Sequence, residues 1–90
     1  MGRQEEAIND YSRIIEASPG DALLYMKRGM LYANTGKYDR SIEDFTRAIG
    51  LSPDNRRAYL SRAMVYRKAG QTGLAEKDEE TAKRMNGIAR

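Results

Sequence analysis

The chain has 90 residues, of which 40% are hydrophobic and 32% charged, and its formal net charge is +3 at pH 7. These values are typical of one small soluble helical domain and exclude a disordered chain, and the mild positive charge permits an acidic partner without demanding one. No apolar run approaches the roughly 18 residues that cross a bilayer and no leader opens the chain, so we expect no membrane partner and favour the cytoplasm for an otherwise undetermined location.

A line of eighteen residues recurs along the chain at a fixed period. Residues 2–19 read GRQEEAINDYSRIIEASP, residues 36–53 read GKYDRSIEDFTRAIGLSP, and residues 70–87 read GQTGLAEKDEETAKRMNG. Pro19 and Pro53 are 34 residues apart, and a period of this length indicates stacked supersecondary units. Apolar residues inside each period recur with helical spacing and no strand pattern competes. The sequence therefore predicts five helices, over residues 4–17, 22–34, 38–51, 55–69 and 72–86.

Capping and turn residues stand at the expected helix boundaries. Asp21 is a candidate N-cap for the second helix, and Asp54 or Asn55 for the fourth. Gly36 and Gly70 supply the tight turns inside each helix pair. We therefore expect antiparallel helix pairs.

Several residues in register carry a family resemblance. The chain contains Tyr25-x2-Arg28-Gly29-x2-Tyr32, then Ser41-x3-Phe45 and Pro53, and the next copy gives Tyr59-x2-Arg62-Ala63-x2-Tyr66 and Ala75-x3-Glu79. This pattern resembles the tetratricopeptide repeat, with tyrosine where that family often has tryptophan and arginine where it often has leucine.

The resemblance implies an all-α fold, a right-handed α-solenoid of antiparallel helix pairs that forms a single domain over residues 1–90. Its expected parts are a half repeat over 1–19, a full repeat over 20–53, a full repeat with a capping helix over 54–87, and a tail over 88–90.

Two Arg–Asp pairs share one spacing. Arg28 and Asp44 are sixteen residues apart, as are Arg62 and Asp78. We interpret them as ion pairs within each helix pair, and not as catalytic carboxylates. Asp10 would need an arginine sixteen residues upstream, before the first residue.

The two ends of the array differ. The first helix turns Ala7 and Ile14 toward a partner helix that the chain does not contain, so residues 4–17 should fray or form a weak homodimer. In the last copy charged residues replace the apolar outer face, and because burying them would cost several kcal/mol, we expect a cap. The replacements are Glu76, Glu79 and Lys83 for Ile42, Phe45 and Ile49, while Ala75 and Ala82 keep the inner face.

A second apolar stripe lies off the buried centre of each first helix, and the resemblance implies that it lines a concave peptide-binding groove. We expect this groove to hold a protein or peptide with apolar anchors, because methionine suits adaptable binding surfaces. Since basic residues lie on or beside the same face, we expect the partner to carry acidic residues as well. The alternative is that the stripe packs against neighbouring helices. The candidate groove residues are the apolar Leu23, Met26, Met30, Leu60 and Met64, the basic Lys27, Arg57, Arg67 and Lys68, and the polar Asn34 and Ser61.

One family variant grips the terminal carboxylate of chaperone peptides with Lys and Asn at set places on successive first helices. Here Met26, Met30 and Ser61 stand where that clamp would want polar groups, and only Arg57 resembles a cationic member. The sequence therefore argues against chaperone-tail binding.

No constellation for catalysis, metal binding or cofactor binding emerges. The chain has no histidine and no cysteine, which removes the commonest general base and the soft metal ligands. The remaining alternatives to a peptide-binding scaffold are self-assembly through the open first helix and contact with RNA. RNA is the weaker of these, because the aromatic residues stand at packing positions and leave none to stack on bases. The RNA reading would depend on Arg56, Arg57, Arg67, Lys68, Lys83 and Arg84.

Overall fold

The fold was analysed in a computed structural model, which describes the backbone of residues 2–88 and the side chains of residues 2–85. Residues 1, 89 and 90, which include most of the predicted tail, lie outside the described residues. All five predicted helices are present, with ends within two residues of the prediction. They are α1 (Arg3–Ala17), α2 (Ala22–Asn34), α3 (Tyr38–Leu51), α4 (Arg56–Lys68) and α5 (Thr72–Ile88).

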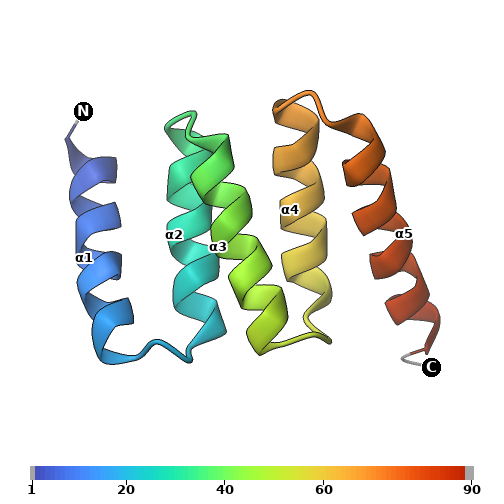
Figure 1. The fold of residues 1–90 in the computed structure, drawn as a ribbon, viewed down its shortest axis with the longest axis horizontal. Coiled ribbons are helices and arrows are strands. Elements are labelled where there is room, and N and C mark those ends of the chain that lie inside the picture. The colour runs from blue at the N-terminus through green and yellow to red at the C-terminus, as the bar shows by residue number, and fades with distance from the viewer. Residues whose placement is uncertain (1, 89–90) are drawn as a thin grey trace.

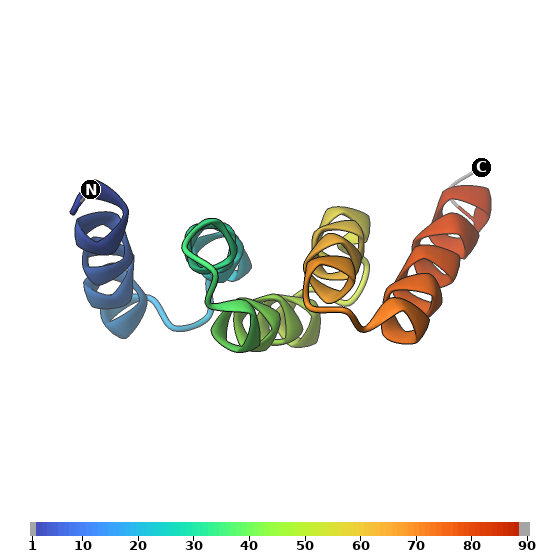
Figure 2. The ribbon, with the colours of Figure 1, turned by 90° about the horizontal axis from the view of Figure 1, so that it is seen from above.

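The helices stand side by side in chain order, each antiparallel to the one before it (Figure 1). Figure 2 shows α2 and α4 on one face of this row and α3 on the opposite face. The array is thin, with principal extents of 39 × 29 × 15 Å. None of the described helices is long and apolar enough to cross a membrane.

The predicted N-caps of α2 and α4 are confirmed. The Asp21 carboxylate accepts a hydrogen bond from the Leu23 N–H at 3.1 Å. Of the two candidates before α4, Asn55 is the cap, because its side-chain oxygen accepts the Ala58 N–H at 3.2 Å. Each cap satisfies one of the four N–H groups that a helix start leaves unpaired.

The two intra-pair turns also follow the prediction. Gly36 and Gly70 have φ values of 80° and 82°, a left-handed conformation that favours glycine. Each turn is closed by the following amide, with the Lys37 N–H donating to the Tyr32 carbonyl and the Gln71 N–H to the Tyr66 carbonyl, both at 2.8 Å.

The core lies between consecutive helices and centres on Phe45, which is fully buried. An added Cβ at Gly29 would lie 3.0 Å from Cε2 of Phe45, so glycine lets the ring approach the α2 backbone. Phe45 therefore packs against α2 of its own helix pair. The buried cluster comprises Ile15, Tyr25, Met26, Ala33, Phe45, Ala48, Ala58 and Val65.

Both predicted Arg–Asp pairs are confirmed, and both are bidentate. Arg28 donates from Nε and Nη2 to the two Asp44 carboxylate oxygens at 2.9 and 2.7 Å. Arg62 does the same to Asp78, at 2.7 and 2.8 Å. The hydrogen bonds to the buried carboxylates raise the pKa of both arginines against the opposing effect of burial.

Each of these arginines has a further partner that the sequence did not reveal. Arg28 donates from Nη1 to the Ser12 hydroxyl on α1 at 3.1 Å, and Arg62 donates to the Thr46 hydroxyl on α3 at 3.0 Å. Ser12 and Thr46 precede their arginines by sixteen residues, as the aspartates follow by sixteen. One guanidinium therefore joins three successive helices.

The last two helices, α4 and α5, are joined by an ion pair at positions where α2 and α3 have apolar residues. Arg67 donates from Nε and Nη2 to the two Glu79 carboxylate oxygens, each at 2.8 Å. The residues 34 positions earlier are Ala33 and Phe45, both buried in the core. The change from aromatic to acid in α5 is thus matched by a change from alanine to arginine in α4.

This contact corrects one part of the sequence interpretation. Glu79 was treated there as part of a charged outer face, whereas its carboxylate bridges back to α4. Ala75 and Ala82 are fully buried and keep the inner face as expected, and Glu76 and Lys83 are exposed.

Candidate functional site on the α2 and α4 face

Apolar side chains lie exposed on α2 and α4, the first helices of the two pairs. These two helices form one face of the row (Figure 2). Met30 on α2 is 38% exposed, and Met64, 34 residues later on α4, is 41% exposed. Leu23 and Leu60, from the same helices, are also exposed. Large apolar groups left in water are candidate contacts for a partner, since burying them is favourable.

Met26 does not belong to this exposed set, and its assignment as an available anchor was wrong. Its side chain is 6% exposed and sits in the core cluster. The Asn55 side-chain amide donates a hydrogen bond to the Met26 sulfur at 3.1 Å. Asn55 therefore caps α4 and also covers Met26. The Met26 side chain belongs to the buried cluster that the helix pairs share.

Three basic side chains remain available on or beside this face. Lys27, Arg57 and Lys68 are exposed, and among the side chains of residues 2–85 no carboxylate forms an ion pair with them. Of the polar residues predicted for the groove, Asn34 is exposed and Ser61 half-buried. These positions give the face a positive character.

Arg67 has a partner within the fold, the Glu79 carboxylate. Its hydrogen bonds to Glu79 raise the Arg67 pKa and lower the Glu79 pKa. Both side chains are nearly half exposed. The ion pair therefore lies at the surface, where the two opposite charges offset each other. Among the side chains of residues 2–85, the other three of the four predicted basic residues have no such ion pair.

Such a face can bind by noncovalent contact. Flexible thioethers reshape around an apolar anchor, and the cations attract carboxylates over longer range. Within residues 2–85, no group of three or more acidic side chains is placed to hold a metal ion.

The open first helix is the other exposed feature that the sequence singled out. Ile14 is 47% exposed. Asp10 lies 4.0 Å from Arg13 on its own helix, whereas Asp44 and Asp78 each receive two guanidinium hydrogen bonds from a neighbouring helix. Among the side chains of residues 2–85, the Asp10 carboxylate therefore lacks the cross-helix partner that the equivalent Asp44 and Asp78 have.

Three of the six basic residues considered for RNA have partners within the fold. Arg56 donates to the Ala82 carbonyl at 3.1 Å, Arg67 binds Glu79, and Arg84 lies 3.8 Å from Glu80. Tyr25 and Tyr32 are buried, so they cannot stack on bases.

The comparisons with known proteins agree with this architecture. The family model described as tetratricopeptide repeat matches residues 2–66. The chain belongs to the tetratricopeptide repeat family. Its members are generally non-catalytic scaffolds, and the resemblance drawn from the sequence is thereby confirmed.

Solved structures of tetratricopeptide repeat proteins superimpose closely. A crystal structure of MamA is 28% identical with a TM-score of 0.92, covering 97% of this chain and 51% of MamA. The second tetratricopeptide repeat domain of Spaghetti (RPAP3), bound to the HSP90 peptide SRMEEVD, is 33% identical with a TM-score of 0.86. That match covers 93% of this chain and 78% of the other. The chain spans about half the length of the MamA chains, and no curated protein sequence matches it.

Proposed function

We propose that this chain is a non-enzymatic scaffold whose α2 and α4 face holds a peptide segment of a protein partner. The observation that carries the proposal is the pair of exposed methionines, Met30 and Met64, at equivalent places on successive first helices. Lys27, Arg57 and Lys68 lie on the same two helices without ion-pair partners among the side chains of residues 2–85.

The partner segment should combine apolar anchors with acidic residues. Met30 and Met64, with Leu23 and Leu60, would cover Leu-like or Phe-like groups, because an unbranched thioether adapts to many shapes. The three cations would speed the encounter with acidic groups more than they deepen the affinity. The peptide bound by the RPAP3 domain, SRMEEVD, is itself acidic with apolar residues, which supports this ligand class.

The same face is poorly suited to grip a terminal carboxylate. Met30 and the half-buried Ser61 occupy places where a clamp needs long polar side chains, and Met26 is enclosed in the core. We therefore expect an internal acidic segment to bind better than a free chain end.

A double substitution tests the proposal. Met30→Glu with Met64→Glu places two negative charges on the face at side chains that are already about 40% exposed, so folding should survive. Peptides selected from a display library on the unaltered chain should carry apolar and acidic residues and should lose binding to this variant. Leu51→Glu with Leu74→Glu is the matched control, since both side chains are similarly exposed but lie on α3 and α5.

Two results would overturn it. One is a library consensus without acidic residues, and the other is equal binding of the selected peptides to both double variants. Circular dichroism of each variant shows whether the helices are intact, and collapse of the Met30/Met64 variant would place those residues in the core instead.

A second candidate, self-assembly through α1, is favoured by the exposed Ile14 and by Asp10, which has no cross-helix partner among the side chains of residues 2–85. Sedimentation would detect a concentration-dependent dimer that Ile14→Glu abolishes. A chain that stays monomeric at every concentration would exclude this function.

A further inference from the structure

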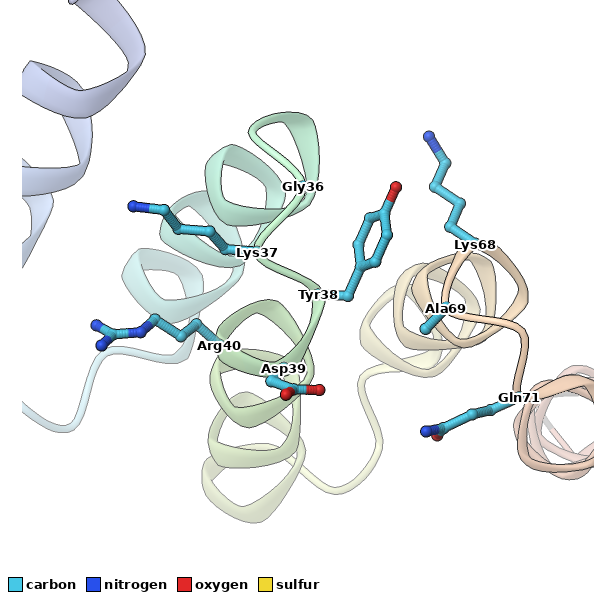
Figure 3. Close-up of a pocket in the computed structure, with 8 residues that line it drawn as sticks. All are labelled: Gly36, Lys37, Tyr38, Asp39, Arg40, Lys68, Ala69 and Gln71. Atoms are coloured by element: carbon cyan, nitrogen blue, oxygen red, sulfur yellow. The ribbon is translucent and has the colours of Figure 1, made fainter.

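Two hollows lie along the edge of the array where the turns inside the helix pairs are found. The larger, of about 530 Å³, lies between residues 36–40 and the end of α4 with its following turn (Figure 3). The smaller, of about 290 Å³, lies between α1 and the α2–α3 turn. Lys37 and Arg40 line both. Neither hollow includes the exposed methionines of the α2 and α4 face.

The charged ends of these two residues gather on the side of the smaller hollow. Figure 3 shows the Lys37 and Arg40 side chains extending away from Lys68 and Gln71, toward the side on which α1 lies. The smaller hollow is lined by Glu5, Ile8, Asn9, Tyr32, Lys37 and Arg40. It therefore contains two cations and one carboxylate beside two buried apolar groups, Ile8 and Tyr32.

The backbone that carries the two cations is fixed. Gly36 adopts its left-handed turn, the Lys37 N–H donates to the Tyr32 carbonyl at 2.8 Å, and the Lys37 carbonyl accepts the Ser41 N–H at 3.0 Å. Lys37 and Arg40 are three residues apart at the start of α3, which places them on one side of the helix. Such preorganisation reduces the conformational entropy that is lost when a ligand binds.

Both cations are also unneutralised within the fold. Among the side chains of residues 2–85, no carboxylate forms an ion pair with Lys37 or Arg40, although Glu5 lines the same hollow. By contrast, Arg28, Arg62 and Arg67 each hold a bidentate carboxylate. Lys37 and Arg40 thus differ from the structural arginines of the chain.

We propose that Lys37 and Arg40 form a second binding site, which takes an acidic segment of a protein partner along the turn edge. The Arg40 guanidinium can hold a carboxylate with two parallel hydrogen bonds, and Lys37 supplies a second positive charge beside it. Glu5 and Asp39 flank the cations and repel a nucleic acid backbone, which carries a charge at every nucleotide. A peptide can instead place neutral residues opposite Glu5 and Asp39.

A labelled peptide tests this site without knowledge of the natural partner. The probe is a fluorescein-labelled peptide in which single glutamates alternate with glycine and serine, so that neutral residues can lie opposite Glu5 and Asp39. Binding is measured by anisotropy at low salt, where exposed charges are least screened. Lys37→Gln with Arg40→Gln should weaken binding about fivefold or more, a loss consistent with two exposed ion pairs. The matched control is Lys77→Gln with Lys83→Gln, which removes the same charge from exposed positions of α5 and should change binding less than about twofold.

Amide chemical shifts of the unaltered chain locate the contact. The probe should perturb residues 36–41 and 5–9, and it should still bind the Met30→Glu, Met64→Glu variant, which separates this site from the proposed peptide-binding face. Equal losses in the edge variant and its control would overturn the proposal, because net charge alone would then explain binding. Perturbations confined to α2 and α4 would overturn it too, as would tighter binding of a labelled oligouridine of equal charge through the same two residues.

Discussion

Gly29 on α2 lies close to the aromatic ring of Phe45 on α3, and replacing it with alanine tests the packing directly. A Cβ at this position would lie 3.0 Å from Cε2 and 3.2 Å from Cδ2 of Phe45, and 3.2 Å from Cβ of Asp44. Favourable carbon–carbon separations are about 3.5–4.0 Å, so three contacts would be too short. Overpacking of a buried site typically costs about 1–3 kcal/mol of unfolding free energy.

A second effect opposes the clash, because alanine favours a helix over glycine by up to about 1 kcal/mol. The expected net loss for Gly29→Ala is therefore roughly 0–2 kcal/mol. Gly50→Ala is the matched control, since Gly50 lies in α3 and an added Cβ would meet nothing within 4 Å. It should gain stability by up to about 1 kcal/mol, with less expected so close to the end of the helix.

Urea denaturation followed by circular dichroism measures both changes. The informative quantity is the difference between the two variants, expected at about 1–3 kcal/mol in favour of Gly50→Ala. If Gly29→Ala stabilised the chain as much as Gly50→Ala, the ring of Phe45 would be free to move and the close approach would not require glycine. The last pair already has Ala63 and Glu79 at the equivalent positions, and so lacks the aromatic ring that requires the glycine.

Three further outcomes are expected. Arg62→Met should lower the free energy of unfolding, measured by urea denaturation, by about 3 kcal/mol, because it leaves the buried Asp78 carboxylate unpaired. Adding Asp78→Leu should recover part of that loss, and the absence of any recovery would contradict this explanation. Arg67 lowers the pKa of Glu79, so the ion pair should stabilise the fold above the ordinary glutamate pKa near 4.5, and this stabilisation should be lost as the pH falls below that value. Glu79→Gln should remove this part of the dependence of stability on pH. If the stability of this variant depended on pH as that of the unaltered chain does, the ion pair would not contribute to the acid dependence. Amides of residues 3–17 should exchange hydrogen faster than those of α4 unless the chain dimerises there, and equal protection in a monomer would refute the idea that α1 is incompletely covered.

Local signals in the sequence were sufficient for the helices and their boundaries. Capping by Asp21 and the turn at Gly36 depend on residues within three or four positions, and the 34-residue period repeats each signal. The Arg28–Asp44 pair could be predicted because its spacing recurs in Arg62–Asp78.

The features that the sequence did not predict depend on contacts between helices. Met26 is buried in a cluster that draws on several helices, and Asn55 of the next helix pair donates a hydrogen bond to its sulfur. The Arg67–Glu79 pair could have been found by aligning the copies, since both positions change together from alanine and an aromatic residue. A helical wheel of one helix gives no such signal, because it contains no information on the neighbouring helix.

The guanidinium that joins three helices sets a rule for altering the length of the array. Because Arg28 contacts Ser12 before it and Asp44 after it, no cut between repeats leaves all three partners in one unit. Insertion or deletion of a 34-residue unit therefore preserves the network only if each new junction brings a hydroxyl sixteen residues before an arginine and an aspartate sixteen residues after it. A repeat transplanted from a protein without that triad would join its backbone to this one but would lose the hydrogen bond between guanidinium and hydroxyl that crosses the seam, and the array would be weaker there.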